Sequence, residues 1–110
     1  MKRYCLALDL ADDPQLIAEY EAHHRAVRPE IQKTITDSGI TVMDIYRAGN
    51  RLFMIMETTD DFSFQEKDAA DAANPVVQAW EGLMWKYQRP IPSAKPGEKW
   101  VIMDQIFKLD

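Results

Sequence analysis

The sequence predicts an α+β fold, a ferredoxin-like βαββαβ arrangement with an antiparallel sheet and helices on one of its faces. Apolar residues alternate with a period of two in four segments, and residues at helical spacing fill the stretches after the first and the third of these segments. The 110 residues contain no repeat, no low-complexity tract and no linker, so residues 1–110 are expected to form a single domain.

Residues 4–10 are predicted to form the first strand, because large apolar side chains alternate along it. Asp12-Asp13-Pro14 predicts the start of a helix, since an Asp side chain caps free amides and Pro suits the first turn. One stripe of this helix carries Leu16, Ile17, Tyr20, His24 and Val27. Pro29 is expected to interrupt the helix, and a short second piece then ends at Ser38-Gly39.

The rest of the chain supplies a hairpin, a helical region and a last strand. Residues 40–47 and 51–58 predict the hairpin, with Ala48-Gly49-Asn50 as its turn. The helical region is expected to start at Asp60-Asp61 and to restart at Asn74-Pro75, after which these residues recur at helical spacing: Val77, Trp80, Met84 and Tyr87. A proline-rich irregular segment follows, and residues 100–109 alternate again, which predicts the last strand.

The predicted strands carry large residues on both faces, such as Ile45 and Tyr46, or Phe53 and Met54. The helices of this fold cover one face only, so the second face is expected to be shielded from water in another way. A symmetric homodimer that packs sheet on sheet would shield it, and so would a ligand pocket.

Composition excludes several classes of partner. Thirteen Lys plus Arg against eighteen Asp plus Glu give a net charge of −5 with no basic run, so neither nucleic acid nor a membrane surface is an expected partner. No apolar stretch approaches the roughly 20 residues that span a bilayer, and the alternating, acid-containing start of the chain predicts a strand rather than a signal peptide. The single cysteine, Cys5, excludes an internal disulfide and fits a cytoplasmic location.

The two histidines are the first candidates for chemistry. Tyr20 and His24 are four residues apart and share the inward face of a helix, whereas His23 is rotated by about 100° toward solvent. Because its ordinary pKa is near neutrality, His24 can take and give a proton at pH 7. The alternative is that Tyr20 and His24 close the end of an amphipathic helix with local hydrogen bonds.

The last third of the chain is rich in aromatic residues, namely Trp80, Trp85, Tyr87 and Trp100. Aromatic faces beside a few polar groups suit a sugar, and Glu81 next to Trp80 can accept hydrogen bonds from hydroxyls; the alternative is a set of core residues. Asp44, on one strand face with Val42 and Tyr46, indicates either an exposed edge or a polar pocket. No metal-ligand spacing, phosphate loop or nucleophile motif occurs, so no metal site and no cofactor are expected.

Three segments resemble the L-rhamnose mutarotase family. Tyr20, His24 and Pro29-Glu30 stand at the spacing of the family's signature helix, and Asp44-Ile45-Tyr46 and Val77-Gln78-Ala79-Trp80 are similar as well. The resemblance implies a dimeric α/β-barrel that interconverts the α and β anomers of a 6-deoxy sugar. It also implies that His24 is the catalytic acid/base and that Tyr20 and Trp80 contact the sugar.

Two positions depart from the family's pattern, and both fall in its sugar pocket. Met43 stands where some rhamnose enzymes have Tyr, and Glu81 replaces the second of two adjacent tryptophans. Residues 84–100 are similar to the branch of the family associated with L-fucose, so L-fucose is the expected substrate and L-rhamnose the alternative. Tyr20, Asp44 and Glu81 all remain candidates for orienting the sugar or sharing its proton transfer.

Two other functions remain open on the residues alone. One is a small dimeric α/β-barrel haem protein or oxygenase, in which His24 would bind iron. The other is a regulatory module that binds a sugar or another metabolite without changing it.

Overall fold

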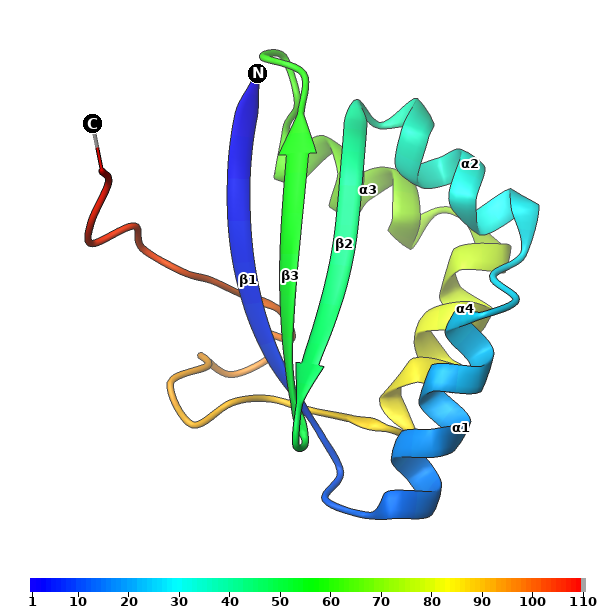
Figure 1. Cartoon of the computed structure of the whole chain (residues 1–110). Coiled ribbons are helices and arrows are strands. Elements are labelled where there is room, and N and C mark those ends of the chain that lie inside the picture. The colour runs from blue at the N-terminus through cyan, green and yellow to red at the C-terminus, as the bar shows by residue number, and fades with distance from the viewer. Residues whose placement is uncertain (110) are drawn as a thin grey trace.

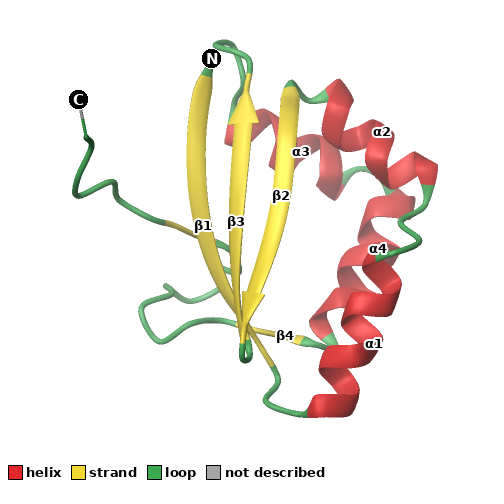
Figure 2. Ribbon diagram, viewed as in Figure 1, coloured by secondary structure: helices red, strands yellow, loops and turns green. Residues whose placement is uncertain are grey.

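The structure is a computed structural model that describes residues 1–109 and contains four helices packed against one sheet (Figures 1 and 2). In chain order the elements are β1 (Lys2–Leu10), α1 (Pro14–His24), α2 (Pro29–Asp37), β2 (Ile40–Ala48), β3 (Arg51–Thr58), α3 (Phe64–Ala72), α4 (Pro75–Trp85), β4 (Gln88–Arg89) and β5 (Val101–Ile102). The predicted α+β fold is confirmed, and each of its two helical regions is split into two helices. None of the helices within residues 1–109 combines the length and the apolar character needed to cross a membrane.

The sheet is antiparallel, with the order β2-β3-β1, and both β4 and β5 pair with the remaining edge of β1. β4 meets β1 at Asp9 and Leu10, and β5 meets it at Leu6 and Ala7. Two strands of two residues each therefore share the position that one longer strand takes in a ferredoxin-like sheet. The short strand β4, which was not predicted, brings Gln88 against the foot of β1.

Local sequence signals set most of the element boundaries. Asp13 caps α1 and Asn74 caps α4, each by accepting hydrogen bonds from two backbone amides, as predicted. Gly39 follows α2 with a φ of 100°, where an added Cβ would also lie 2.7 Å from a neighbouring side chain. The predicted helix start at Asp60-Asp61 is wrong, because the side chain of Ser63 caps α3 instead.

The core lies between the sheet and the helices, which gather on one side of it (Figure 1). β1 and β3 point alternate residues toward the helices, and these side chains are buried: Leu6, Leu8, Leu10, Leu52, Met54 and Met56. The helices and the chain just after them return Tyr20, Ile31, Val77, Met84 and Tyr87 to the same layer. Tyr20 is thus held in the core and fixes the neighbouring turn of α1.

The predicted last strand over residues 100–109 is wrong beyond its first residues. Only Val101–Ile102 pair with β1, and one further backbone bond joins the Met103 amide to the Cys5 carbonyl oxygen at 2.7 Å. The chain then leaves β1 and runs away from the helices (Figure 1), with Ile106 96% exposed. Alternation alone makes no strand, because each strand needs a neighbour along its length, and this segment lacks one within residues 1–109.

The sheet face away from the helices carries both large apolar and charged side chains and lacks a covering helix within residues 1–109. Its side chains include Phe53 and Ile55, which are half-buried, and Tyr46, which is 57% exposed. The prediction of large residues on both faces is therefore confirmed.

Candidate active site

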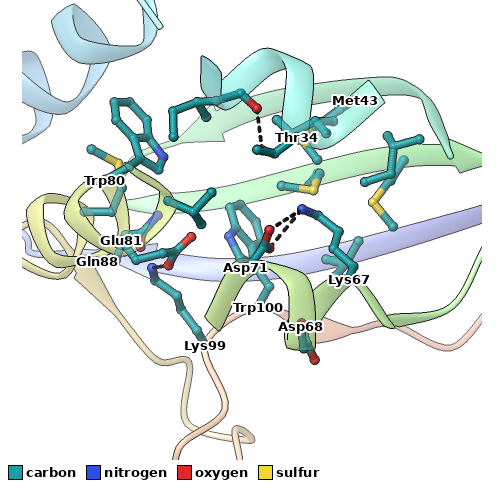
Figure 3. Close-up of a pocket in the computed structure, with 18 of the residues that line it drawn as sticks. Thr34, Met43, Lys67, Asp68, Asp71, Trp80, Glu81, Gln88, Lys99 and Trp100 are labelled. Carbon is teal, nitrogen blue, oxygen red and sulfur yellow. Dashed lines mark hydrogen bonds and ion pairs between the residues drawn. The ribbon is translucent and has the colours of Figure 1, made fainter. Parts of the chain in front are cut away.

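A cavity of about 990 Å³ lies between the inner face of the sheet and the helices. One end is lined by aromatic and polar side chains: Tyr20, His24, Trp80, Glu81, Gln88, Lys99 and Trp100. The other end is richer in methionine and carries the Lys67–Asp71 ion pair, as Figure 3 shows. The polar, aromatic end has the composition of a site for a small polyhydroxylated ligand.

His24 is the last residue of α1 and is half-buried in the polar end of the cavity. Its Nδ1 lies 3.0 Å from the backbone carbonyl oxygen of Tyr20. A carbonyl oxygen only accepts, so Nδ1 carries a hydrogen and the neutral ring keeps its lone pair on Nε2. Nε2 makes no hydrogen bond within residues 1–109, which leaves it available as a base. Burial lowers the pKa of His24 below its ordinary 6.5, against the opposing effect of the Tyr20 carbonyl, so the ring is neutral at pH 7.

Tyr20 stands one helical turn before His24, and the two ring centroids are 4.3 Å apart. The side chain is buried, and its hydroxyl oxygen accepts a hydrogen bond from Gln88 Nε2 at 3.2 Å. Burial, together with the charge of Glu81, raises the pKa of Tyr20 to about 12 despite the opposing hydrogen bond from Gln88. The phenol therefore stays protonated at pH 7 and has a hydrogen to donate.

Trp80 and Glu81 approach this site from α4. The indole of Trp80 meets the ring of His24 edge to face, with centroids 5.5 Å apart. The Glu81 carboxylate is paired with Lys99 Nζ at 2.5 Å, and Lys99 also lies over the ring of Trp85, 4.8 Å from its centroid. Figure 3 shows this ion pair at the polar end of the cavity, beside Trp80 and Gln88.

The structure brings five of the six sequence-predicted site residues to one cavity and leaves Asp44 outside it. Met43 lies on β2 opposite Met56 and lines the cavity, farther along it than Trp80 (Figure 3). Asp44 is exposed on the other face of the sheet, opposite Ile55. Adjacent residues of a strand point to opposite faces, so Met43 and Asp44 cannot both reach one cavity.

His23 does not point to solvent, and that prediction is wrong. It is half-buried, and its Nε2 lies 3.2 Å from the hydroxyl of Tyr87. That hydroxyl donates to Glu19 Oε1 at 3.0 Å, so His23 belongs to a hydrogen-bonded row beside α1. The chain after α4 returns along the side of α1 that the helical pattern alone assigns to water.

Sequence reasoning missed several polar residues of the cavity, among them Gln88 and Lys99 at its aromatic end. Both follow α4 in segments that the pattern reads as irregular, and their partners, Tyr20 and Glu81, lie 68 and 18 residues away in the chain. Gln88 could have been assigned to the cavity only by predicting that β4 pairs with β1. Within residues 1–109 the structure contains no group of three or more His, Cys, Asp or Glu side chains that is placed to hold a metal ion.

Comparison with known proteins identifies the family of this chain. A family model described as L-rhamnose mutarotase matches residues 3–109. The L-fucose mutarotase of Xanthomonas campestris pv. campestris is 45% identical over 99% of this chain and 89% of that protein, and the L-rhamnose mutarotase of Phocaeicola vulgatus is 32% identical over the full length of both. The crystal structure of an L-rhamnose mutarotase from Formosa agariphila has the same fold, with a TM-score of 0.73, 18% identity and full coverage of both chains. The chain therefore belongs to the L-rhamnose mutarotase family.

Proposed function

We propose that this protein is a mutarotase that interconverts the α and β anomers of L-fucose. The observation that carries the proposal is the fixed tautomer of His24, whose Nε2 makes no hydrogen bond within residues 1–109 and whose ring lines the cavity together with Trp80 and Tyr20. A neutral imidazole of this kind is the group that exchanges protons best near pH 7. The proposed site comprises His24 as the catalytic residue and Tyr20, Met43, Trp80 and Glu81 as substrate contacts.

The proposed reaction needs only proton movements. His24 Nε2 takes the proton of the anomeric hydroxyl as the bond between C1 and the ring oxygen breaks, and the resulting imidazolium gives that proton to the ring oxygen. Rotation about the C1–C2 bond and reversal of these steps close the ring on the other face. The neutral Tyr20 hydroxyl donates a hydrogen bond to the ring oxygen and stabilises the negative charge that develops on it.

L-fucose is favoured over L-rhamnose by the Glu81–Lys99 ion pair. The pair places a carboxylate and an ammonium beside Trp80, at a position where the family resemblance implies a second tryptophan. Carboxylate oxygens accept hydrogen bonds from hydroxyls, whereas an indole face stacks on C–H groups, so the two side chains suit sugars with differently placed hydroxyls. The 45% identity to a protein named L-fucose mutarotase supports the same choice.

Saturation-transfer NMR on the anomeric protons tests this function. The rate of anomer exchange is measured for L-fucose and for L-rhamnose, with and without the protein. We expect the protein to increase the exchange rate of L-fucose more than that of L-rhamnose. Faster exchange of L-rhamnose would establish the alternative substrate, and acceleration of neither sugar would overturn the proposed activity.

We also propose that residues 1–110 act as a single mutarotase domain that forms a cytoplasmic homodimer. The large side chains of Tyr46, Phe53 and Ile55 on the uncovered sheet face support a second copy packed sheet on sheet. The presence of one cysteine, Cys5, as a free thiol supports a reducing compartment.

A further inference from the structure

Gln88 carries the one buried side-chain N or O atom without a hydrogen-bond partner within residues 1–109. The residue is 4% exposed, on the short strand β4, and it lines the polar end of the cavity. Its Nε2 donates to the Tyr20 hydroxyl at 3.2 Å, whereas its Oε1 makes no bond. Figure 3 shows Gln88 close to Glu81, at the same end as Trp80.

A buried amide oxygen without a partner needs an explanation. Nearly all buried polar atoms in folded proteins are paired, because an unpaired one has lost its hydration and gained nothing in return. The bond to Tyr20 accounts for only one half of the amide. An apolar side chain of the same length would fill the volume without leaving an acceptor unsatisfied, so the packing of β4 does not explain the oxygen.

The groups around Gln88 define what the missing partner is. Glu81 and Lys99 are paired with each other, and the Tyr20 oxygen already accepts from Gln88. The three side chains nearest this point that line the cavity, His24, Tyr20 and Gln88, each keep one function without a partner within residues 1–109: the Nε2 lone pair, the hydroxyl hydrogen and Oε1, respectively. They form two acceptors and one donor, which complement two hydroxyl groups and one ether oxygen of a cyclic sugar.

We propose that Gln88 is a specificity-determining residue whose Oε1 accepts a hydrogen bond from a ring hydroxyl of the sugar other than the anomeric one. Its Nε2 at the same time holds the oxygen of Tyr20, so that the phenolic hydrogen is free for the substrate. Gln88 is uncharged and exchanges no proton in the reaction; it selects and orients the sugar. This proposal rests on the proposed mutarotase function and adds a second recognition point to it.

The test compares wild-type protein with Gln88→Met, which keeps the chain length and removes both polar atoms. Anomer exchange is measured for L-fucose and for its three analogues that lack the hydroxyl at C2, C3 or C4. We expect Gln88→Met to raise KM for L-fucose about tenfold more than KM for the one analogue that lacks the bound hydroxyl, because the loss of the Tyr20 contact is common to all four sugars. The matched control is Gln15→Met, the same change on the exposed face of α1, and it should behave as wild type with every sugar.

Gln88→Glu serves as a second variant, which also applies if Gln88→Met does not fold. It keeps an acceptor oxygen at the same place, so it should keep the wild-type order of preference among the four sugars. The proposal would be overturned if Gln88→Met raised KM equally for all four sugars. It would also be overturned if the variant had the same KM values as the wild type.

Failure of the mutarotase function itself gives a different result. In that case the wild-type protein accelerates exchange of no sugar, and the Gln88 contact is then tested by titrating L-fucose against tryptophan fluorescence. Weaker binding by Gln88→Met than by Gln15→Met supports the contact, and equal or absent binding in both overturns it.

Discussion

The ring of His24 is tied to its own helix, because its Nδ1 donates to the backbone carbonyl oxygen of Tyr20 at 3.0 Å. One short-range contact thus selects the tautomer and limits the rotation of the ring. It also leaves Nε2 without a hydrogen bond within residues 1–109, in a ring that lines the same cavity as Trp80 and Tyr20. We therefore expect this histidine, at the end of a helix, to act as an oriented base.

The activity is expected to depend on pH through His24. The neutral ring is the base, so activity is present above the pKa and is lost as the pH falls through it. Because burial lowers this pKa, the midpoint of the loss should lie below 6.5. Exchange rates measured from pH 4 to pH 8, with the uncatalysed rate subtracted, check the prediction, and a midpoint above 6.5 would contradict it.

Replacement of Tyr20 by Phe should reduce both activity and stability. The hydroxyl accepts from Gln88 Nε2 in the core, and its loss leaves that amide without a partner. We expect Tyr20→Phe to lower the free energy of unfolding by about 1–3 kcal/mol and the exchange rate for L-fucose by at least about tenfold. Urea unfolding and NMR exchange provide the two measurements. A variant with a wild-type exchange rate would exclude the hydroxyl from the mechanism.

Glu81→Trp should shift the preference between sugars. The change removes the carboxylate that pairs with Lys99 and replaces it with a stacking surface beside Trp80. We expect the ratio of kcat/KM for L-fucose to that for L-rhamnose to fall about tenfold. Leu83→Trp, on the exposed side of α4, is the control and should leave the ratio unchanged. An unchanged ratio in Glu81→Trp as well would exclude Glu81 as the source of the preference.

The exposed sheet face should mediate dimerisation. Tyr46 is 57% exposed on that face, so Tyr46→Asp introduces a charge there without disturbing the core. We expect wild-type protein to sediment as a dimer and Tyr46→Asp as a monomer. Leu83→Asp, an equivalent change on α4, should remain dimeric. A monomeric wild type, or a dimer that tolerates the Tyr46 change, would contradict the sheet-on-sheet arrangement.

Much of the fold was predictable because its signals are local. Asp13 and Asn74 cap helices through amides two or three residues away, and the alternation of β3 reports directly which side chains are buried. The last strand was not predictable in the same way. Val101–Ile102 stop pairing where the chain leaves the edge of β1, and the alternation of the following residues contains no information about that edge.

The site residues also divide into those placed by local signals and those placed by contacts with distant segments. Tyr20 and His24 are neighbours by helical spacing alone, so their pairing is evident in the sequence. The partners of Gln88 and His23 come from distant segments, so neither contact leaves a local signal. The position of Asp44 was predictable from the sequence. Asp44 follows Met43 directly in the strand, so only one of the two side chains can face the helices.

The central claim is that His24 is the base that opens and closes the sugar ring. Saturation-transfer NMR of L-fucose with His24→Gln, against His23→Gln as the matched control, tests it most directly. We expect His24→Gln to lower the protein-catalysed exchange rate by a factor of about 10²–10⁴ and His23→Gln to retain most of it. An exchange rate in His24→Gln equal to that of the wild type would show that His24 is not the base.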